Sequence, residues 1–319
     1  MSIVSSQTDI KVVDSVPTLL SLLDNFTSLP VHPPALYLDL EGIKLGRDGS
    51  ISILSLYIAS TNKIYLVDIN RLGRTAFSTS NSRATSLKAI LESPTIPKVI
   101  FDVRNDSDAL FSLYQISVGG IEDLQLMELA SRPGPKDFVA GLATCIENDS
   151  LVSAAAKAQW QRTKDGARQL YDPERGGRYE IFNVRPMRPE IVQYCAQDVA
   201  LLPGLYEVYS AKLAPPGEMF WRVQVQQATR DWVKLSQSPG YDGQAKSKVC
   251  GPWDKLYIQQ ATDDWNEEIM FKAMHGDNGN EYEDEYEDEY EDDGWHRDDT
   301  TARDCIGWEE DMVKNGEYF

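Results

Sequence analysis

The sequence predicts an α/β protein in which a mixed β-sheet is covered by helices. Apolar runs rich in β-branched residues come first and are joined by short turns. A later strand leads into a helix, and helical patterns follow up to about residue 215. The chain has 319 residues, 42% of them hydrophobic and 10% aromatic, so it can bury a sizeable core and has the length of about two domains.

The N-terminal part of the fold is predicted from local patterns. Residues 10–30 read as a helix, because the stretch is rich in leucine and Pro30 would end it. Apolar runs at 36–42, 51–58 and 64–68 read as three strands. Because only short polar turns separate these strands, we expect an antiparallel meander.

The rest of the predicted body mixes short strands with helices. Pro189 suits the first turn of the last of these helices, which we expect to be the longest, and the run from Pro215 to Gly217 closes the body. The expected elements are a polar loop at 71–83, a helix near 86–92, a strand at 98–101, a helix at 102–114, a strand at 121–124, and helices at 124–130, 151–160 and 189–212.

The negative charge of the chain is concentrated at one end. The formal charge is −19, but residues 261–319 hold 22 of the 50 acidic residues and only 4 of the 31 lysines and arginines. The body is therefore close to neutral, and the low pI says nothing against a nucleic-acid substrate. Residues 281–293 contain ten acids and no base, which predicts a disordered, solvated tail.

Two further hypotheses concern this tail. It would act as a mimic of nucleic acid if it competed for a basic face of the body. Deletion of residues 261–319 would then tighten substrate binding at low salt, and an unchanged affinity would contradict the idea. Residues 304–310 are a candidate docking segment for a protein partner.

Cysteine and histidine usage argues against several classes of protein. The four cysteines are widely spaced without any C-x-x-C pair, and there are only three histidines, so neither a zinc site nor a disulfide framework is expected. We see no secretory signal, and no apolar run approaches the roughly 20 residues that span a membrane. We therefore expect an intracellular protein, cytoplasmic or nuclear, with reduced cysteines and no membrane partner.

Two carboxylates share one face of the strand predicted at 36–42. Alternation along a strand places Asp39 and Glu41 side by side, next to Gly42, where another group could approach closely. Two ionised carboxylates at such a distance repel each other, and bound divalent cations would account for the pair. The alternative is a strand that simply runs out into a polar turn.

Two more acidic positions stand out further along the chain. Asp106 follows the strand at 98–101, although an acid there is also typical of a helix N-terminus. Tyr194 and Asp198 lie four residues apart and so share one face of the helix at 189–212. Asp198 is surrounded by apolar residues, which favours a partner for its carboxylate over a solvated acid.

These residues, in this order, resemble the three motifs of the DEDDy 3′–5′ exonucleases. The spacing is similar to that of the branch with ribonuclease D and the Egalitarian-like exonuclease-domain proteins, and the resemblance covers roughly residues 10–215. It implies an RNase H-like fold and hydrolysis of single-stranded nucleic acid from its 3′ end, with RNA favoured over DNA. Phe101 departs from the pattern, because many relatives have histidine there.

The resemblance also implies the catalytic groups. Asp39, Glu41, Asp106 and Asp198 would hold two Mg²⁺ or Mn²⁺ ions, for which carboxylate oxygens are suitable ligands. Tyr194 would orient the attacking water. The alternative is a catalytically weak exonuclease-fold protein that serves as an RNA-binding or adaptor module. The intact set of acids argues against that alternative, because a pure binding module does not need them.

Basic and aromatic residues alternate between 161 and 188. This pattern fits phosphate contacts combined with base stacking on a single strand, or else a solvated loop whose arginines pair with nearby acids. The candidate nucleic-acid contacts are Arg104, Arg162, Lys164, Arg168, Arg178 and Arg185. The partners expected on this basis are the 3′ ends of single-stranded RNA or DNA.

The chain divides into three parts on these patterns. Residues 10–215 form the exonuclease domain. Residues 216–260, which contain three tryptophans, form a helical or loop extension that packs on the body. Residues 261–319 form the acidic, low-complexity tail.

Overall fold

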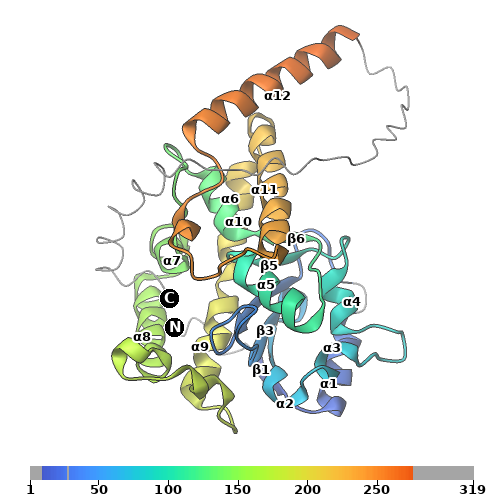
Figure 1. Cartoon of the computed structure of the whole chain (residues 1–319), viewed down its shortest axis with the longest axis vertical. Helices are drawn as coiled ribbons and strands as arrows, with labels where there is room; N and C mark the ends of the chain where they lie inside the picture. Colours follow the sequence, from blue (N-terminus) through green and yellow to red (C-terminus); the bar gives the residue numbers. More distant parts are fainter. Residues whose placement is uncertain (1–8, 27–28, 276–319) are drawn as a thin grey trace. The chain divides into compact units, whose positions relative to one another are not determined.

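The computed structural model describes residues 9–26 and 29–275 (Figure 1). Two compact units divide the chain. One contains the residues up to Arg132 together with Ala140–Ala245, and the other contains Pro133–Val139 together with the residues from Lys246 onward. The acidic repeat at 281–293 and the candidate docking segment at 304–310 lie outside the described residues.

A mixed sheet of six strands forms the centre of the first unit and confirms the predicted fold class. The strand order is β1-β4-β3-β2-β5-β6, with β2, β3 and β4 as the predicted antiparallel meander and β1, β5 and β6 parallel to their neighbours. The strands are β1 (Asp9–Val13), β2 (Leu36–Glu41), β3 (Ile53–Ile58), β4 (Lys63–Asp68), β5 (Lys98–Ile100) and β6 (Ile121–Asp123).

Strand β2 occupies an inner position between β3 and β5. Its leucines 36, 38 and 40 are buried, and so is Tyr37, because helices cover the sheet. Asp39 lies opposite Ser55 of β3 and Glu41 lies opposite Ile53. The hydrogen-bond ladder with β3 therefore fixes the backbone that carries the two carboxylates.

Helices surround the sheet in the first unit (Figure 1). They are α1 (Val16–Leu23), α2 (Ile69–Leu72), α3 (Thr75–Ser78), α4 (Leu87–Glu92), α5 (Val103–Tyr114), α6 (Leu124–Ser131), α7 (Leu142–Asp149), α8 (Ala154–Tyr171), α9 (Pro189–Ala200), α10 (Leu202–Leu213) and α11 (Met219–Gln237). Short 3₁₀ turns occur at Asp24–Phe26, Ala59–Thr61, Pro173–Arg175, Tyr179–Asn183 and Pro216–Glu218.

The prediction of a helix over residues 10–30 was wrong in its first part. Residues Asp9–Val13 form β1, which pairs in parallel with the edge of β4, with Val12 opposite Leu66. The helix starts only at Val16, after Ser15, whose backbone N–H donates to Thr18 Oγ1 at 3.2 Å. The pairing of β1 with β4 joins segments that are far apart in the chain, so local leucine content did not reveal it.

The single long helix predicted at 189–212 is two helices. Helix α9 ends at Ala200 and α10 starts at Leu202, with Leu201 between them and Pro203 in the first turn of α10. Proline has no backbone N–H to donate to the preceding turn, and its ring clashes there, so the first helix stops. Both α11 and α12 (Lys255–His275) are longer than either of the two.

Helical structure also extends into segments that were predicted to be loops. Helix α8 continues to Tyr171, through the first part of the basic and aromatic segment. Helix α7 was not predicted. The single-turn helices α2 (69–72) and α3 (75–78) lie in or beside the loop predicted at 71–83. These pieces are short or polar, and their amphipathic faces are defined only by what they pack against.

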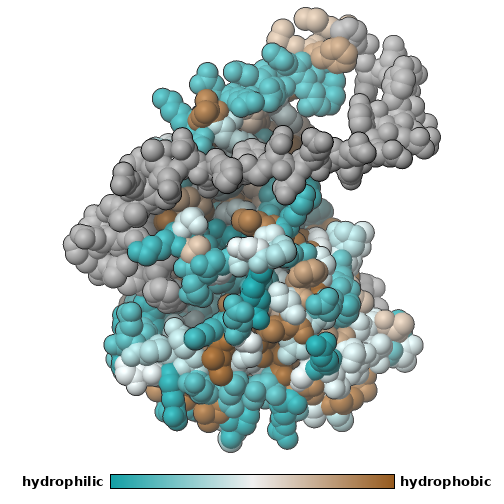
Figure 2. Space-filling view, in the orientation of Figure 1, coloured by the Kyte–Doolittle hydropathy of each residue, from teal (hydrophilic) through white to brown (hydrophobic). Residues whose placement is uncertain are grey.

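Helix α11 packs against α5 and α6 within the first unit. Its buried residues include Val225, Ala228 and Trp232. Helix α11, which carries Trp221 and Trp232 of the predicted extension, therefore packs on the body, whereas Trp253 belongs to the second unit. On the face of the molecule drawn in Figure 2, hydrophobic residues of this unit are scattered among hydrophilic ones.

The second unit contains the long helix α12 (Lys255–His275) and a 3₁₀ turn at Lys246–Val249. Val139 N–H donates to Val249 C=O at 2.9 Å, and the side chain of Trp253 is buried. Among the described helices of both units, none combines the length and apolar character that would be needed to cross a membrane.

Candidate active site

Three of the predicted acids come together on one side of the sheet. Asp39 and Glu41 belong to β2, and α9, which carries Asp198, packs across β2, β3 and β4. One carboxylate oxygen from each of these three residues lies within 4.8 Å of the other two. Among the residues that the structure describes, this is the group of acidic, cysteine or histidine side chains suited to holding a metal ion.

Two oxygens of this acid cluster (Asp39, Glu41 and Asp198) are buried without a hydrogen-bond partner. They are Asp39 Oδ2 and Asp198 Oδ1. A buried, unpartnered carboxylate oxygen is costly, because it has given up water without gaining a donor. Divalent cations such as Mg²⁺ or Mn²⁺ bind carboxylate oxygens in this kind of setting, so the residues present fit a metal ion.

The electrostatics of the acid cluster lead to the same conclusion. Burial, followed by the charge of Asp198, raises the pKa of Asp39 to about 7. Burial, followed by the charge of Asp39, raises the pKa of Glu41 well above its usual range. Burial also raises the pKa of Asp198. One buried and two half-buried carboxylates this close together are unfavourable in the ionised form without positive charge nearby, and a metal ion would supply that charge.

Lys164 supplies one positive charge from the protein itself. This residue of α8 places Nζ 3.9 Å from Asp198 Oδ2 and 4.6 Å from the centroid of the Trp160 ring. Only 12% of its side chain is exposed. Its charge opposes the rise in the pKa of Asp39, Glu41 and Asp198. The structure thus places Lys164, predicted as a nucleic-acid contact, at the acid cluster.

Tyr194 lies one turn before Asp198 on α9 and is buried. Its ring centroid is 5.5 Å from that of Tyr171 and 6.4 Å from that of Phe182. Burial, followed by the charge of Glu41, raises the pKa of Tyr194 far above its ordinary value, so its hydroxyl keeps its proton. The Tyr194 hydroxyl acts against burial, because it lowers the pKa of Glu41 and of Asp198.

Asp106 lies on a different element from the acid cluster. It belongs to the first turn of α5 and is 7% exposed. It is not among the three described acids whose oxygens lie within 4.8 Å of one another. Helix α5 starts after Asp102, which has a φ of 58° and accepts from Arg104 N–H at 3.3 Å. The position of Asp106 therefore depends on how α5 is held.

Two of the predicted nucleic-acid contacts, Arg104 and Arg185, instead bind other side chains of the first unit. Arg104 is 4% exposed, with Nε 2.6 Å from Asp102 Oδ1 and its guanidinium 3.9 Å from the centroid of the Trp232 ring. Arg185 forms an ion pair with the buried Asp68, with Nη2 2.7 Å from Oδ1. Sequence patterns could not show the contacts with Trp232 and Asp68, because these residues lie on other elements far away in the chain.

The other predicted contacts lie on or just after α8. Arg162 and Arg178 are exposed, and Arg168 is half-buried. The charge of Arg168 opposes the rise in the pKa of Asp198, which places it in the field of the acid cluster. Tyr171, at the end of α8, packs on Tyr194 and belongs to the surroundings of the site, a role that the sequence analysis missed. Its position in an aromatic-rich stretch was the available signal.

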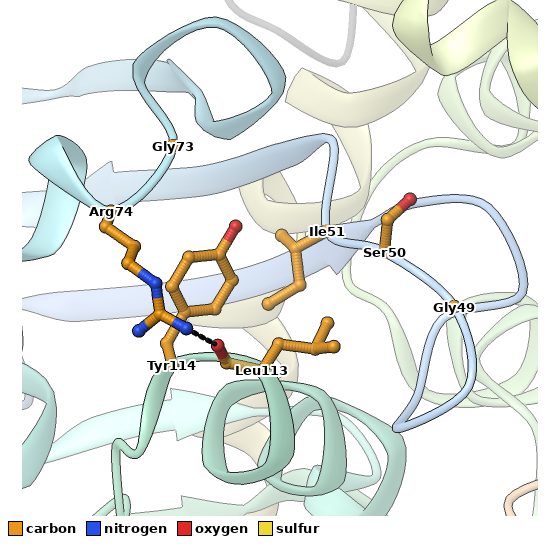
Figure 3. Close-up of a pocket in the computed structure, with 7 residues that line it drawn as sticks. All are labelled: Gly49, Ser50, Ile51, Gly73, Arg74, Leu113 and Tyr114. Carbon is orange, nitrogen blue, oxygen red and sulfur yellow. Dashed lines mark hydrogen bonds between the residues drawn. The ribbon is translucent and has the colours of Figure 1, made fainter.

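A separate cleft of about 290 Å³ lies beside the C-terminal end of α5 (Figure 3). Arg74 Nη2 donates to Leu113 C=O at 3.2 Å there, and its guanidinium lies 5.8 Å from the centroid of the Tyr114 ring. The cleft is lined by Gly49, Ser50, Ile51, Gly73, Arg74, Leu113 and Tyr114. None of these is a residue of the predicted site.

Comparisons with known proteins agree with the fold. The model of a family described as 3′–5′ exonuclease matches residues 18–213. No curated protein matches the sequence. Among solved structures, Trypanosoma brucei RNase D in complex with RNA U12 has a TM-score of 0.60 and 15% identity, over 81% of this chain and 80% of that one.

Two further solved structures from the same organism are similar to this chain. The complex of Trypanosoma brucei RNase D with GMP has a TM-score of 0.60 and 17% identity, over 81% of this chain and 73% of that one. The catalytic core of Trypanosoma brucei RRP6 has a TM-score of 0.50 and 17% identity, over 85% and 66%. At these identities the likeness concerns the fold.

Proposed function

The chain belongs to the family of 3′–5′ exonucleases of the DEDDy type, and we propose that it shortens single-stranded RNA from the 3′ end with the help of two divalent metal ions. The observation that carries this proposal is the acid cluster. Two of its buried oxygens, Asp39 Oδ2 and Asp198 Oδ1, have no partner. A site built to be satisfied within the protein would have a donor for each of them.

The roles of the residues follow from their positions. Asp39, Glu41 and Asp198 would hold the ions together with Asp106 of α5. When bound, Mg²⁺ or Mn²⁺ lowers the pKa of water and stabilises the charge that develops on the leaving 3′ oxygen. Tyr194 keeps its proton and lies beside Glu41 and Asp198, so its hydroxyl would orient the attacking water.

The substrate class rests on two kinds of support. The solved RNase D structures of similar fold were determined with RNA U12 and with GMP, which favours RNA over DNA. Arg162, Arg168 and Arg178 lie on or after α8, the helix that brings Lys164 to the acid cluster. We assign these three arginines to the phosphates of the strand that leads into the site.

The test is degradation of single-stranded RNA and DNA, each labelled at the 5′ or at the 3′ end, in the presence of Mn²⁺. We expect the 5′-labelled RNA to shorten stepwise and the 3′ label to be released at once. Asp39→Asn and Asp198→Asn should remove this activity, because each takes a charged oxygen from the acid cluster.

Two other outcomes would decide against parts of the proposal. Faster shortening of DNA would reverse the assignment of the substrate. Binding of the strands without shortening by the wild type would replace the exonuclease with the adaptor or RNA-binding module. Titration with Mn²⁺ in a calorimeter tests the metal site itself. The acid cluster predicts specific Mn²⁺ binding that Asp39→Asn weakens.

A further inference from the structure

The two residues that precede Asp106 on α5 contact one other part of the chain. The guanidinium of Arg104 lies 3.9 Å from the centroid of the Trp232 ring. The hydroxyl of Tyr241 donates to Asn105 Oδ1 at 2.7 Å. Trp232 belongs to the last turns of α11, and Tyr241 follows that helix. We refer to residues 232–241 as the brace.

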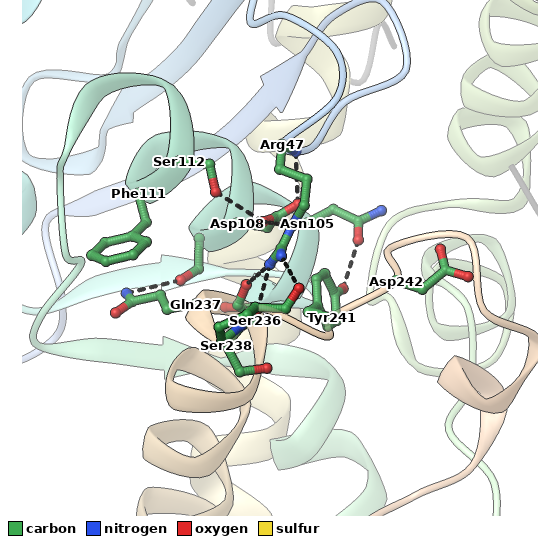
Figure 4. Close-up of polar contacts among 12 residues, drawn as sticks. Arg47, Asn105, Asp108, Phe111, Ser112, Ser236, Gln237, Ser238, Tyr241 and Asp242 are labelled. Atoms are coloured by element: carbon green, nitrogen blue, oxygen red, sulfur yellow. Dashed lines mark hydrogen bonds and ion pairs between the residues drawn. The ribbon is translucent and has the colours of Figure 1, made fainter.

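Asp108, two residues after Asp106, is bound by the loop that follows β2. The backbone N–H of Arg47 donates to Asp108 Oδ2 at 2.8 Å, and Arg47 Nε donates to Asp108 Oδ1 at 2.9 Å (Figure 4). Only 2% of the Asp108 side chain is exposed, so this ion pair is shielded from water. Gly46 has a φ of 145°, and a Cβ there would lie 3.0 Å from Asp108 Oδ2, so this approach requires glycine.

The rest of the Arg47 guanidinium binds the brace. Arg47 Nη2 donates to the carbonyls of Ser236 and Ser238 at 2.9 and 2.8 Å, and Nη1 donates to the carbonyl of Pro239 at 2.9 Å (Figure 4). Carbonyls at the C-terminal end of a helix have no partner within it and carry partial negative charge. One arginine therefore joins three elements, namely the loop after β2, helix α5 and the end of α11.

We infer that Arg47 is a positioning residue that, together with the brace, holds Asp106 at the working distance from the acid cluster. This inference rests on the proposed function. Asp106 is on α5, whereas the cluster is on β2 and α9, so the join between α5 and the loop after β2 sets the separation. The brace lies beyond the family match at 18–213, so the metal site depends on residues outside the matched domain.

The experiment measures Mn²⁺ binding to the full chain. Binding is measured by calorimetry and by the electron paramagnetic resonance signal of the Mn²⁺ that remains free. We expect two ions in the wild type. Arg47→Met should leave the ion held by the acid cluster within about twofold of its wild-type affinity. It should weaken the second ion by about tenfold or more, as loss of an outer-shell partner does. Arg47→Lys keeps the positive charge but not the several N–H donors of the guanidinium. The affinity of this variant for the second ion should therefore lie between those of the wild type and Arg47→Met.

Arg222→Met is the matched control. Arg222 also belongs to α11 and also donates to three carbonyls at the end of a helix, those of Leu213, Ala214 and Pro215 at 2.5, 3.2 and 2.9 Å. It is at the opposite end of α11 from the brace. This variant should lose thermal stability and retain both ions. Tyr241→Phe removes only the hydrogen bond to Asn105 and serves if Arg47→Met does not fold; it should weaken the second ion in the same direction.

The outcomes separate this inference from the proposed function. An unchanged second ion in Arg47→Met, or equal weakening of it in Arg222→Met, would overturn the role of Arg47 and leave the exonuclease proposal standing. Absence of specific Mn²⁺ binding to the wild type would overturn both. Selective loss of the second ion in Arg47→Met, with both ions retained in Arg222→Met, supports the inference.

Discussion

Tyr194 shows how burial selects the chemistry of a single residue. Its ring is enclosed by Tyr171 and Phe182, and its hydroxyl faces Glu41 and Asp198. Because its pKa is raised by burial and by Glu41, a phenolate is unfavourable there. The residue can orient water as a donor and acceptor, whereas accepting a proton as a base is excluded.

Tyr194→Phe tests this role directly. The phenyl ring retains the packing against Tyr171 and Phe182, so the melting temperature and Mn²⁺ affinity should stay close to those of the wild type. Loss of the hydroxyl should lower kcat for RNA about 100-fold, as removal of a positioned proton-handling group does. Single-turnover kinetics measure this, and an unchanged kcat would remove Tyr194 from the mechanism.

Lys98 is a buried charge outside the site. Its Nζ donates to the carbonyls of Ile90 and Ser93 at 2.9 and 2.6 Å, and burial lowers its pKa to about 8 from 10.5. Between these two values the unfolded chain binds a proton that the folded chain does not. The free energy of unfolding therefore rises with pH across the window from 8 to 10.5, and this contribution is lost as the pH falls through 8.

The comparison of wild type with Lys98→Met isolates that effect. The difference in free energy of unfolding, wild type minus variant, should increase between pH 8 and 10.5 and stay constant below pH 7. Urea denaturation at several pH values measures it, and other titrating groups cancel in the difference. A difference independent of pH would mean that Lys98 keeps an ordinary pKa in the folded state.

At the scale of elements, glycines show where the backbone of the site has no spare room. A Cβ at Gly42, which follows Glu41, would lie 1.8 Å from the carbonyl oxygen of Ser50. The two strands of the β2–β3 hairpin thus approach one another closely just beyond the carboxylates. Gly166, in the middle of α8, has nothing within 4 Å of the same position.

The two Gly→Ala substitutions should have opposite effects. Gly42→Ala should destabilise the protein by about 3 kcal/mol or more, because neither backbone can move without distorting β2. Gly166→Ala should stabilise it by about 0.5–1 kcal/mol, because alanine loses less conformational freedom in a helix. Urea midpoints measure both, and a well-tolerated Gly42→Ala would show that the hairpin can open.

At the scale of the whole molecule, the first compact unit ends at residue 245, beyond the end of the family match at 213, and lacks only residues 133–139 before that point. Helix α11 belongs to the first unit, where it covers α5 and α6 with Val225, Ala228 and Trp232. The family match and the folding unit are therefore different in extent. The division at 215 and 260 predicted from the sequence and the unit that ends at 245 therefore differ in which shortened chains should fold.

We expect a chain that ends at residue 245 to unfold cooperatively and to bind Mn²⁺ as the full chain does. A chain that ends at residue 215 should be aggregated or only partly folded, because the surfaces of α5 and α6 under α11 would be exposed. Circular dichroism melts and gel filtration distinguish these results. A stable chain ending at 215 would support the exonuclease domain at 10–215 as an independent unit.

The sequence by itself determined the strands β2 to β6, most of the helices and the order of the three motifs. These depend on local patterns, since side-chain alternation, turn residues and an acid among apolar neighbours are visible within a few positions. The family assignment followed from that order. The meander of β2, β3 and β4 was predictable because short turns leave adjacent strands little choice of partner.

Only the tertiary structure decided the contacts between distant segments. It paired β1 with β4, buried Arg104 on Trp232, and brought Lys164 to Asp198. It also joined Arg47 to the end of α11. A charged residue in a sequence has many possible partners, and the choice depends on which elements pack together. The apolar surfaces of the whole fold make that choice, and no short stretch of the chain contains it.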